Sequence, residues 1–78
     1  MSETMERLQD VFREVFANDD LEISPATTAA DIEEWDSLMH VNLMLAVENE
    51  FAIRFSSSEV AALKNVGELA GMVQRKAG

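Results

Sequence analysis

The sequence predicts an all-α fold, namely a small antiparallel four-helix bundle with three longer helices and one short one. Two observations carry this prediction. Apolar residues recur at helical spacing in segments 4–16, 37–51 and 66–73, and the one extended stretch, residues 52–55, is too short to indicate a sheet. With 78 residues the chain is expected to be one domain over residues 1–78, because a second domain would leave neither half enough residues for a core.

The first helix is expected over residues 4–16, where charged residues separate a row of apolar ones. A polar cluster at residues 18–20 should end it, since Asn and Asp side chains bond to nearby backbone and compete with helix. A long loop over 17–35 follows, with the only proline, Pro25, and with a short turn of helix near residues 29–33. The apolar residues that would tie this loop to the core are Leu21, Ile23, Ile32 and Trp35.

The clearest helix prediction covers residues 37–51, with Asp36 or Ser37 as its N-cap. Two further helices are expected because the cap-plus-acid spacing of a capping box occurs twice downstream. The first has Ser56 as cap with Glu59 three residues on, and it runs to about residue 63. The second has Asn65 as cap with Glu68 three residues on.

The helix predicted over 37–51 has more apolar surface than so small a domain can bury. We expect one stripe of it to face water as a docking surface, although both stripes could belong to the core. Periodicity does not decide which stripe lies outside. The first stripe comprises Leu43, Met44, Val47 and Phe51, and the second comprises Leu38, Val41 and Leu45 with Met39 beside it.

The charge is strongly negative and uneven. Fifteen acidic and six basic residues give a formal net charge of −9, which disfavours nucleic-acid binding and attracts basic protein surfaces. Residues 17–53 contain nine of the acids and no base, so the whole excess lies in this half. A functional surface is therefore expected there.

Composition excludes several other classes. No apolar run approaches the roughly 18 residues of a membrane-spanning helix, and residues 1–6 do not resemble a secretory signal. The chain has no cysteine and one histidine, so neither a disulfide nor a metal site is expected. We therefore expect a cytoplasmic, monomeric protein that does not insert into a membrane.

Ser37 stands where the loop becomes a helix, and three roles are open to it. It can serve only as a cap. It can carry an anion such as a phosphodiester, which the unpaired N–H groups and positive dipole of a helix start favour. It can also be a nucleophile paired with His40, but no glycine-rich elbow lies nearby and nothing clearly supplies an oxyanion hole. No enzyme is therefore expected.

Trp35 and His40 flank this serine in the sequence. Trp35 is expected to anchor the loop in the core, with contact to a partner as the alternative. His40 is expected to be a partly solvated side chain near the helix start.

Three segments together resemble the acyl carrier protein family: EWDSL at 34–38, VENEF at 47–51 and VGEL at 66–69. The resemblance extends to length, acidity, helix order and the position of the Asp-Ser-Leu motif. It implies an acyl-carrier-like bundle with a covalent 4′-phosphopantetheine arm, taken from coenzyme A, whose thiol carries acyl intermediates as thioesters. The cofactor-binding residues would be Ser37, as the attachment point, with Asp36 and Leu38 beside it.

The same resemblance implies a set of partners. These are a phosphopantetheinyl transferase and acyl-activating, ketosynthase or acyltransferase enzymes with basic docking patches. The helix after the serine would be the main recognition surface. The partner-binding residues would be Asp36, Leu38, Met39, Val41, Leu45 and Glu48.

The chain departs from the carriers of fatty-acid synthesis, which usually have acids soon after the serine. Here those positions are Met39, His40 and Asn42. This favours a specialised lipid, polyketide or natural-product pathway over housekeeping fatty-acid synthesis. The alternative from another class is an acidic helical adaptor that binds a basic partner without any cofactor.

Overall fold

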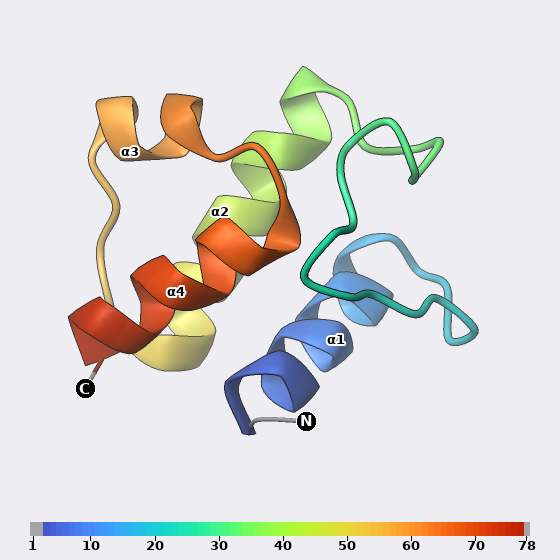
Figure 1. Cartoon of the computed structure of the whole chain (residues 1–78). Coiled ribbons are helices and arrows are strands. Elements are labelled where there is room, and N and C mark those ends of the chain that lie inside the picture. The colour runs from blue at the N-terminus through green and yellow to red at the C-terminus, as the bar shows by residue number, and fades with distance from the viewer. Residues whose placement is uncertain (1–2, 78) are drawn as a thin grey trace.

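The computed structural model describes residues 3–77, and within that range the chain forms four helices and no strand (Figure 1). The predicted all-α class, with three longer helices and one short helix, is therefore confirmed. The helices are α1 (Glu3–Val15), α2 (Ser37–Phe51), α3 (Ser57–Ala62) and α4 (Val66–Ala77).

The hydrophobic core lies between α1, α2 and α4, with two buried isoleucines added by the long loop. Burial of each large aliphatic or aromatic side chain there stabilises the fold by roughly 1.5–3 kcal/mol. Helix α3 contributes no buried residue. The large side chains that are fully buried are Leu8, Phe12, Leu43, Val47, Val66, Leu69 and Val73.

Helices α1 and α2 are each followed by an alanine in the left-handed region. Ala17 has φ 51° and Ala52 has φ 55°. The polar cluster at residues 18–20 was predicted to end α1, but the chain turns one residue earlier, at Ala17. There the N–H of Asn18 donates to the carbonyl of Arg13 over 3.0 Å, which satisfies a carbonyl at the helix end.

The loop over residues 16–36 is fastened to the start of α4. The N–H of Val66 donates to the carbonyl of Thr27 over 2.9 Å, and that of Gly67 donates to the carbonyl of Pro25 over 2.8 Å. A Cβ at Gly67 would lie 2.9 Å from the Pro25 carbonyl oxygen, so this close approach requires glycine. The helix start and the loop thus satisfy each other's polar groups.

The short turn of helix expected near residues 29–33 was wrong, because these residues form turns and bends without a helix. The Asp31 carboxylate accepts a hydrogen bond from the N–H of Thr28 over 2.9 Å, and the Asp31 N–H donates to the Thr28 carbonyl over 3.0 Å. Side-chain bonds of this kind offer the backbone an alternative to helix.

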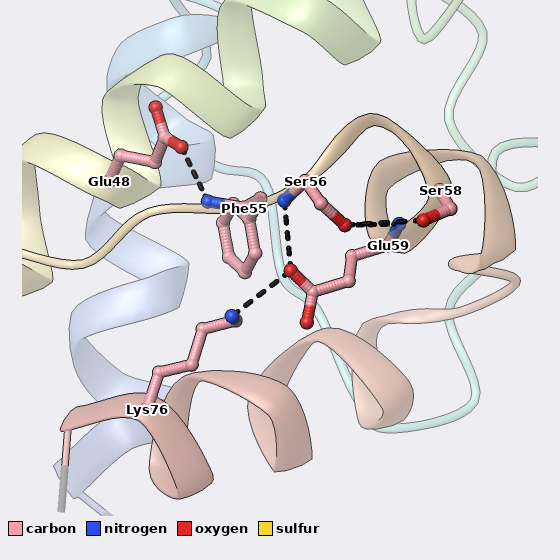
Figure 2. A network of polar contacts seen from close by, with 6 residues as sticks. All are labelled: Glu48, Phe55, Ser56, Ser58, Glu59 and Lys76. Carbon is pink, nitrogen blue, oxygen red and sulfur yellow. Dashed lines mark hydrogen bonds and ion pairs between the residues drawn. The ribbon is translucent and has the colours of Figure 1, made fainter.

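Helix α3 is held largely by polar contacts (Figure 2). The predicted capping box is confirmed, since Ser56 Oγ accepts from the Glu59 N–H at 3.2 Å and the Ser56 N–H donates to Glu59 Oε1 at 2.8 Å. Lys76 Nζ, from the end of α4, lies 3.0 Å from the same carboxylate. The Ser56 N–H first, and Lys76 second, lower the pKa of Glu59. On the α2 side, the Glu48 carboxylate accepts from the N–H of Phe55 at 2.7 Å.

Candidate functional site

Ser37 is the first residue of α2, and its position follows from the residue before it. Asp36 is the N-cap, since its carboxylate accepts from the N–H of Met39 at 2.9 Å. The serine is therefore released from capping and is exposed. Within residues 3–77 its hydroxyl has no hydrogen-bond partner. The positive end of the α2 dipole lies beside it.

The cleft of about 420 Å³ that Ser37 helps to line runs between the start of α2 and the α3–α4 connection. Its walls are mixed, with apolar surface from the core side and polar groups from the loop and helix starts. The lining residues are Ala29, Trp35, Asp36, Ser37, His40, Met44, Leu63, Lys64, Asn65 and Leu69.

Trp35 and His40 join the loop, α2 and α3 at the wall of this cleft. The indole N–H of Trp35 donates to His40 Nδ1 at 3.1 Å, and the two rings stack with centroids 5.9 Å apart. Because Nδ1 accepts, the ring proton of the neutral imidazole lies on Nε2, which donates to the carbonyl of Val60 at 3.1 Å. The other edge of Trp35 packs on Phe12 at a centroid distance of 5.4 Å.

These contacts bear on two sequence interpretations. Trp35 is partly buried and packs on α1, as expected of a loop anchor. His40 has both ring nitrogens bonded elsewhere and forms no hydrogen bond with Ser37 in the described chain. The geometry therefore offers no support for a serine nucleophile activated by His40.

The two apolar stripes of α2 separate clearly. Leu38, Val41 and Leu45 are 70%, 52% and 54% exposed. The opposite stripe faces the core, and Met39 is half-buried at the boundary. The expectation that one stripe faces water is thus met, and the outward one is the stripe nearer Ser37 in sequence. The inward residues are Leu43, Met44 and Val47, with Phe51 partly buried.

The acids of α2 are occupied within the fold. The helix has no acidic residue in its first turn. Glu48 accepts from the Phe55 N–H, and Glu50 pairs with Arg7 at 3.0 Å. The exposed part of α2 near Ser37 carries Leu38, Val41 and the neutral Asn42 and no acid, and the acids before Ser37 lie in the loop. Glu33 and Glu34 are exposed there, and so is Asp31, whose carboxylate is bonded to Thr28.

Neither a metal site nor a membrane-spanning helix is found in the part of the chain that the structure describes. No group of three or more metal-ligating side chains comes together there. None of its helices is long and apolar enough to cross a membrane.

An exposed serine at the start of a helix, beside a cleft and an exposed apolar helix face, defines a small helical carrier domain. The comparisons agree with this class. A family model described as phosphopantetheine attachment site matches residues 6–73. Acyl carrier protein 2 of Ralstonia nicotianae is 27% identical over 73 residues, covering 94% of this chain and 90% of that protein. The solution structure of a holo acyl carrier protein from Geobacter metallireducens is similar with a TM-score of 0.89 and 41% identity, covering 96% of this chain and 86% of that one.

The chain belongs to the acyl carrier protein family, whose members carry phosphopantetheine. Members of this family are carriers and not enzymes, and they work with partner enzymes in acyl transfer. The structure fits this cofactor, because Ser37 is exposed, its hydroxyl has no partner among the described residues, and it lines a cleft that has room for the first part of an arm.

Sequence reasoning missed two features of this site. One is the Trp35–His40–Val60 chain of hydrogen bonds, whose members come from three different elements. The other is Lys64, which lines the cleft from the α3–α4 connection. No local motif contains either set, so only the tertiary structure brings them together.

Proposed function

We propose that Ser37 is the attachment point of 4′-phosphopantetheine and that the chain carries acyl groups for a specialised lipid, polyketide or natural-product pathway. One observation supports the attachment point best. Ser37, the serine of the Asp-Ser-Leu motif, is exposed and lines the cleft, and its hydroxyl has no hydrogen-bond partner within residues 3–77. Two neighbours fix it there, Asp36 by capping α2 and Leu38 by continuing the helix.

The transfer places one new bond on this serine. Ser37 Oγ would bond to the phosphorus that bears the pantetheine arm of coenzyme A, the phosphoanhydride bond would break, adenosine 3′,5′-bisphosphate would leave, and the hydroxyl proton would pass to solvent or to the transferase. When bound, the arm supplies the thiol that holds an acyl group as a thioester. The absence of cysteine in the chain leaves that thiol without a competitor in the polypeptide.

The exposed stripe of α2 is proposed as the partner surface, with Leu38, Val41 and Leu45 at its centre. Three apolar side chains in a row give an area suited to the buried middle of a transient interface. The pathway assignment rests on the same helix, because its first turn lacks the acids expected of a fatty-acid-synthesis carrier.

The test is the mass of the intact protein after incubation with coenzyme A, Mg²⁺ and a promiscuous phosphopantetheinyl transferase. The wild type should gain one phosphopantetheine, and Ser37→Ala should gain none. Ser57→Ala is the matched control, because Ser57 is an exposed serine that opens α3 as Ser37 opens α2, and this variant should load normally. A wild-type protein that stays unmodified would favour the cofactor-free adaptor, for which Ser37→Ala is neutral and Leu45→Asp abolishes partner binding.

A further inference from the structure

We propose that Lys64 binds the phosphodiester that joins the arm to Ser37 and so directs the first part of the arm along the cleft. This inference rests on the proposed attachment at Ser37. Lys64 and Ser37 belong to different elements, the α3–α4 connection and the start of α2, yet both line the same cleft.

The backbone of Lys64 is fixed on both sides while its side chain remains exposed. Leu63 before it packs against the core and donates its N–H to the carbonyl of Val60. Asn65 after it caps α4, since its side-chain oxygen accepts from the N–H of Glu68 at 2.8 Å. The backbone of Lys64 is therefore held at the cleft, and among residues 3–77 its ammonium group has no hydrogen-bond partner or ion pair, so it can meet a ligand.

Apart from Ser37 itself, the other side chains of the lining that can donate or accept hydrogen bonds already have partners. Asp36 caps α2, both ring nitrogens of His40 are bonded, and the oxygen of Asn65 caps α4. Lys64 is the positively charged side chain of this lining, and within residues 3–77 it forms no ion pair. Lysine binds phosphate as a mobile point charge and requires no second donor in a fixed geometry.

A cation at this position would offset local negative charge. A phosphodiester at Ser37 adds a negative charge next to the exposed Asp36 and shortly after the exposed acids Glu33 and Glu34 in the sequence, in a chain whose net charge is already −9. Repulsion over distances within the screening length of about 8–10 Å would push the arm away from the loop. Lys64 offsets this repulsion and biases the arm toward the wall of the cleft that the α3–α4 connection forms.

The test uses the holo forms of the wild type, Lys64→Met, Lys64→Arg and Arg54→Met, each verified by intact mass and circular dichroism. Arg54 is the matched control, because it is an exposed cation that lines a different groove with Leu45 and Asn49. The readouts are the ³¹P chemical shift of the arm and the change of the Lys64 side-chain methylene resonance between apo and holo protein. The urea-unfolded holo-protein gives the ³¹P reference for an undocked arm.

We expect Lys64→Met to move the ³¹P resonance toward this reference, with a roughly two- to fivefold loss of docked arm, as for an exposed charge pair. Lys64→Arg should retain the wild-type position, Arg54→Met should leave it unchanged, and high salt should move the wild type in the same direction as Lys64→Met. A loaded Lys64→Met protein with the wild-type ³¹P shift overturns the inference alone. A wild-type protein that never acquires a ³¹P signal overturns the proposed function instead.

Discussion

The hydrogen bonds of His40 provide the sharpest test of how the cleft is built. The substitution His40→Phe keeps an aromatic ring that can stack on Trp35 but removes both ring nitrogens. The indole N–H of Trp35 and the carbonyl of Val60 each lose a partner at a part-buried site. At about 0.5–1.5 kcal/mol for each of the two hydrogen bonds, the free energy of unfolding should fall by about 1–3 kcal/mol.

Urea and thermal unfolding followed by circular dichroism measure this loss, which corresponds to a fall in Tm of about 4–8 °C per kcal/mol for a domain of this size. A double-mutant cycle with Trp35→Phe separates the Trp35–His40 bond from other effects, with a coupling energy of about 0.5–1.5 kcal/mol expected. Additive effects, with coupling below about 0.3 kcal/mol, would refute the reasoning, since distant independent sites behave in that way.

The same variant should loosen α3 more than the rest of the chain. This helix buries no residue and depends on polar contacts, among which the His40–Val60 bond is one. Loss of about 1 kcal/mol there should speed amide exchange in α3 by about fivefold when exchange occurs by local opening. Equal acceleration in α1, which packs in the core, would show that the bond stabilises the whole domain and not the wall of the cleft.

Three further predictions concern backbone and charge. Gly67→Ala should lower the free energy of unfolding by about 1–2 kcal/mol, because its Cβ would press on the Pro25 carbonyl. Gly71→Ala should raise that free energy by up to about 1 kcal/mol, because its Cβ would meet only Arg75 Nη1, at an ordinary contact distance of 3.7 Å. Paired urea titrations compare the two variants. Ala52→Gly should raise Tm by a few degrees, since a left-handed alanine costs roughly 1 kcal/mol that glycine avoids; an unchanged Tm would contradict this. The pKa of Glu59 is lowered in the folded state, so its ionised carboxylate stabilises the fold above the ordinary glutamate pKa, and this stabilisation is lost as the pH falls through the lowered value. The Tm of Glu59→Gln should therefore lie below that of the wild type at neutral pH. In acid, the Tm values of the variant and the wild type should converge.

The helices of this fold could be predicted closely because their signals are local. Asp36, Ser56 and Asn65 each cap a helix through a bond to a backbone N–H only three residues away. The end of α1 was predicted less well, because Ala17 carries no sign of its left-handed conformation. That conformation is imposed by the path of the chain.

The sequence could not predict which side of α2 faces solvent. Both stripes of this helix consist of large apolar side chains, so periodicity could not decide which one faces the core. Packing decides: α1 and α4 cover the stripe of Leu43 and Val47, which are fully buried, and leave Leu45 exposed. The sequence could not place Lys64 at the site either, because Lys64 and Ser37 come to line the same cleft only through the tertiary contacts between the long loop and the start of α4.

The arrangement of charge around α2 has a consequence for how partners approach. Glu50 is tied to Arg7, whose guanidinium also lies over the Phe51 ring at 4.4 Å, and Glu48 is tied to the Phe55 N–H. These contacts hold the end of the helix and give both of its acids a partner within the fold, while Glu50 stays exposed. We therefore expect the loop before Ser37, with the exposed Glu33 and Glu34, to contribute most to the attraction of a basic partner.

We therefore expect association with a partner and dissociation from it to depend on different residues, namely the loop acids and the exposed apolar stripe of α2. Long-range attraction governs association rates, while desolvated apolar contacts govern dissociation. With the phosphopantetheinyl transferase as the measured partner, neutralising Glu33 and Glu34 to Gln should slow association and weaken its dependence on salt. Leu45→Ala should instead speed dissociation and leave the salt dependence unchanged. Surface plasmon resonance distinguishes the two, and a Leu45→Ala effect confined to the association rate would show that the apolar stripe does not form the buried middle of the interface.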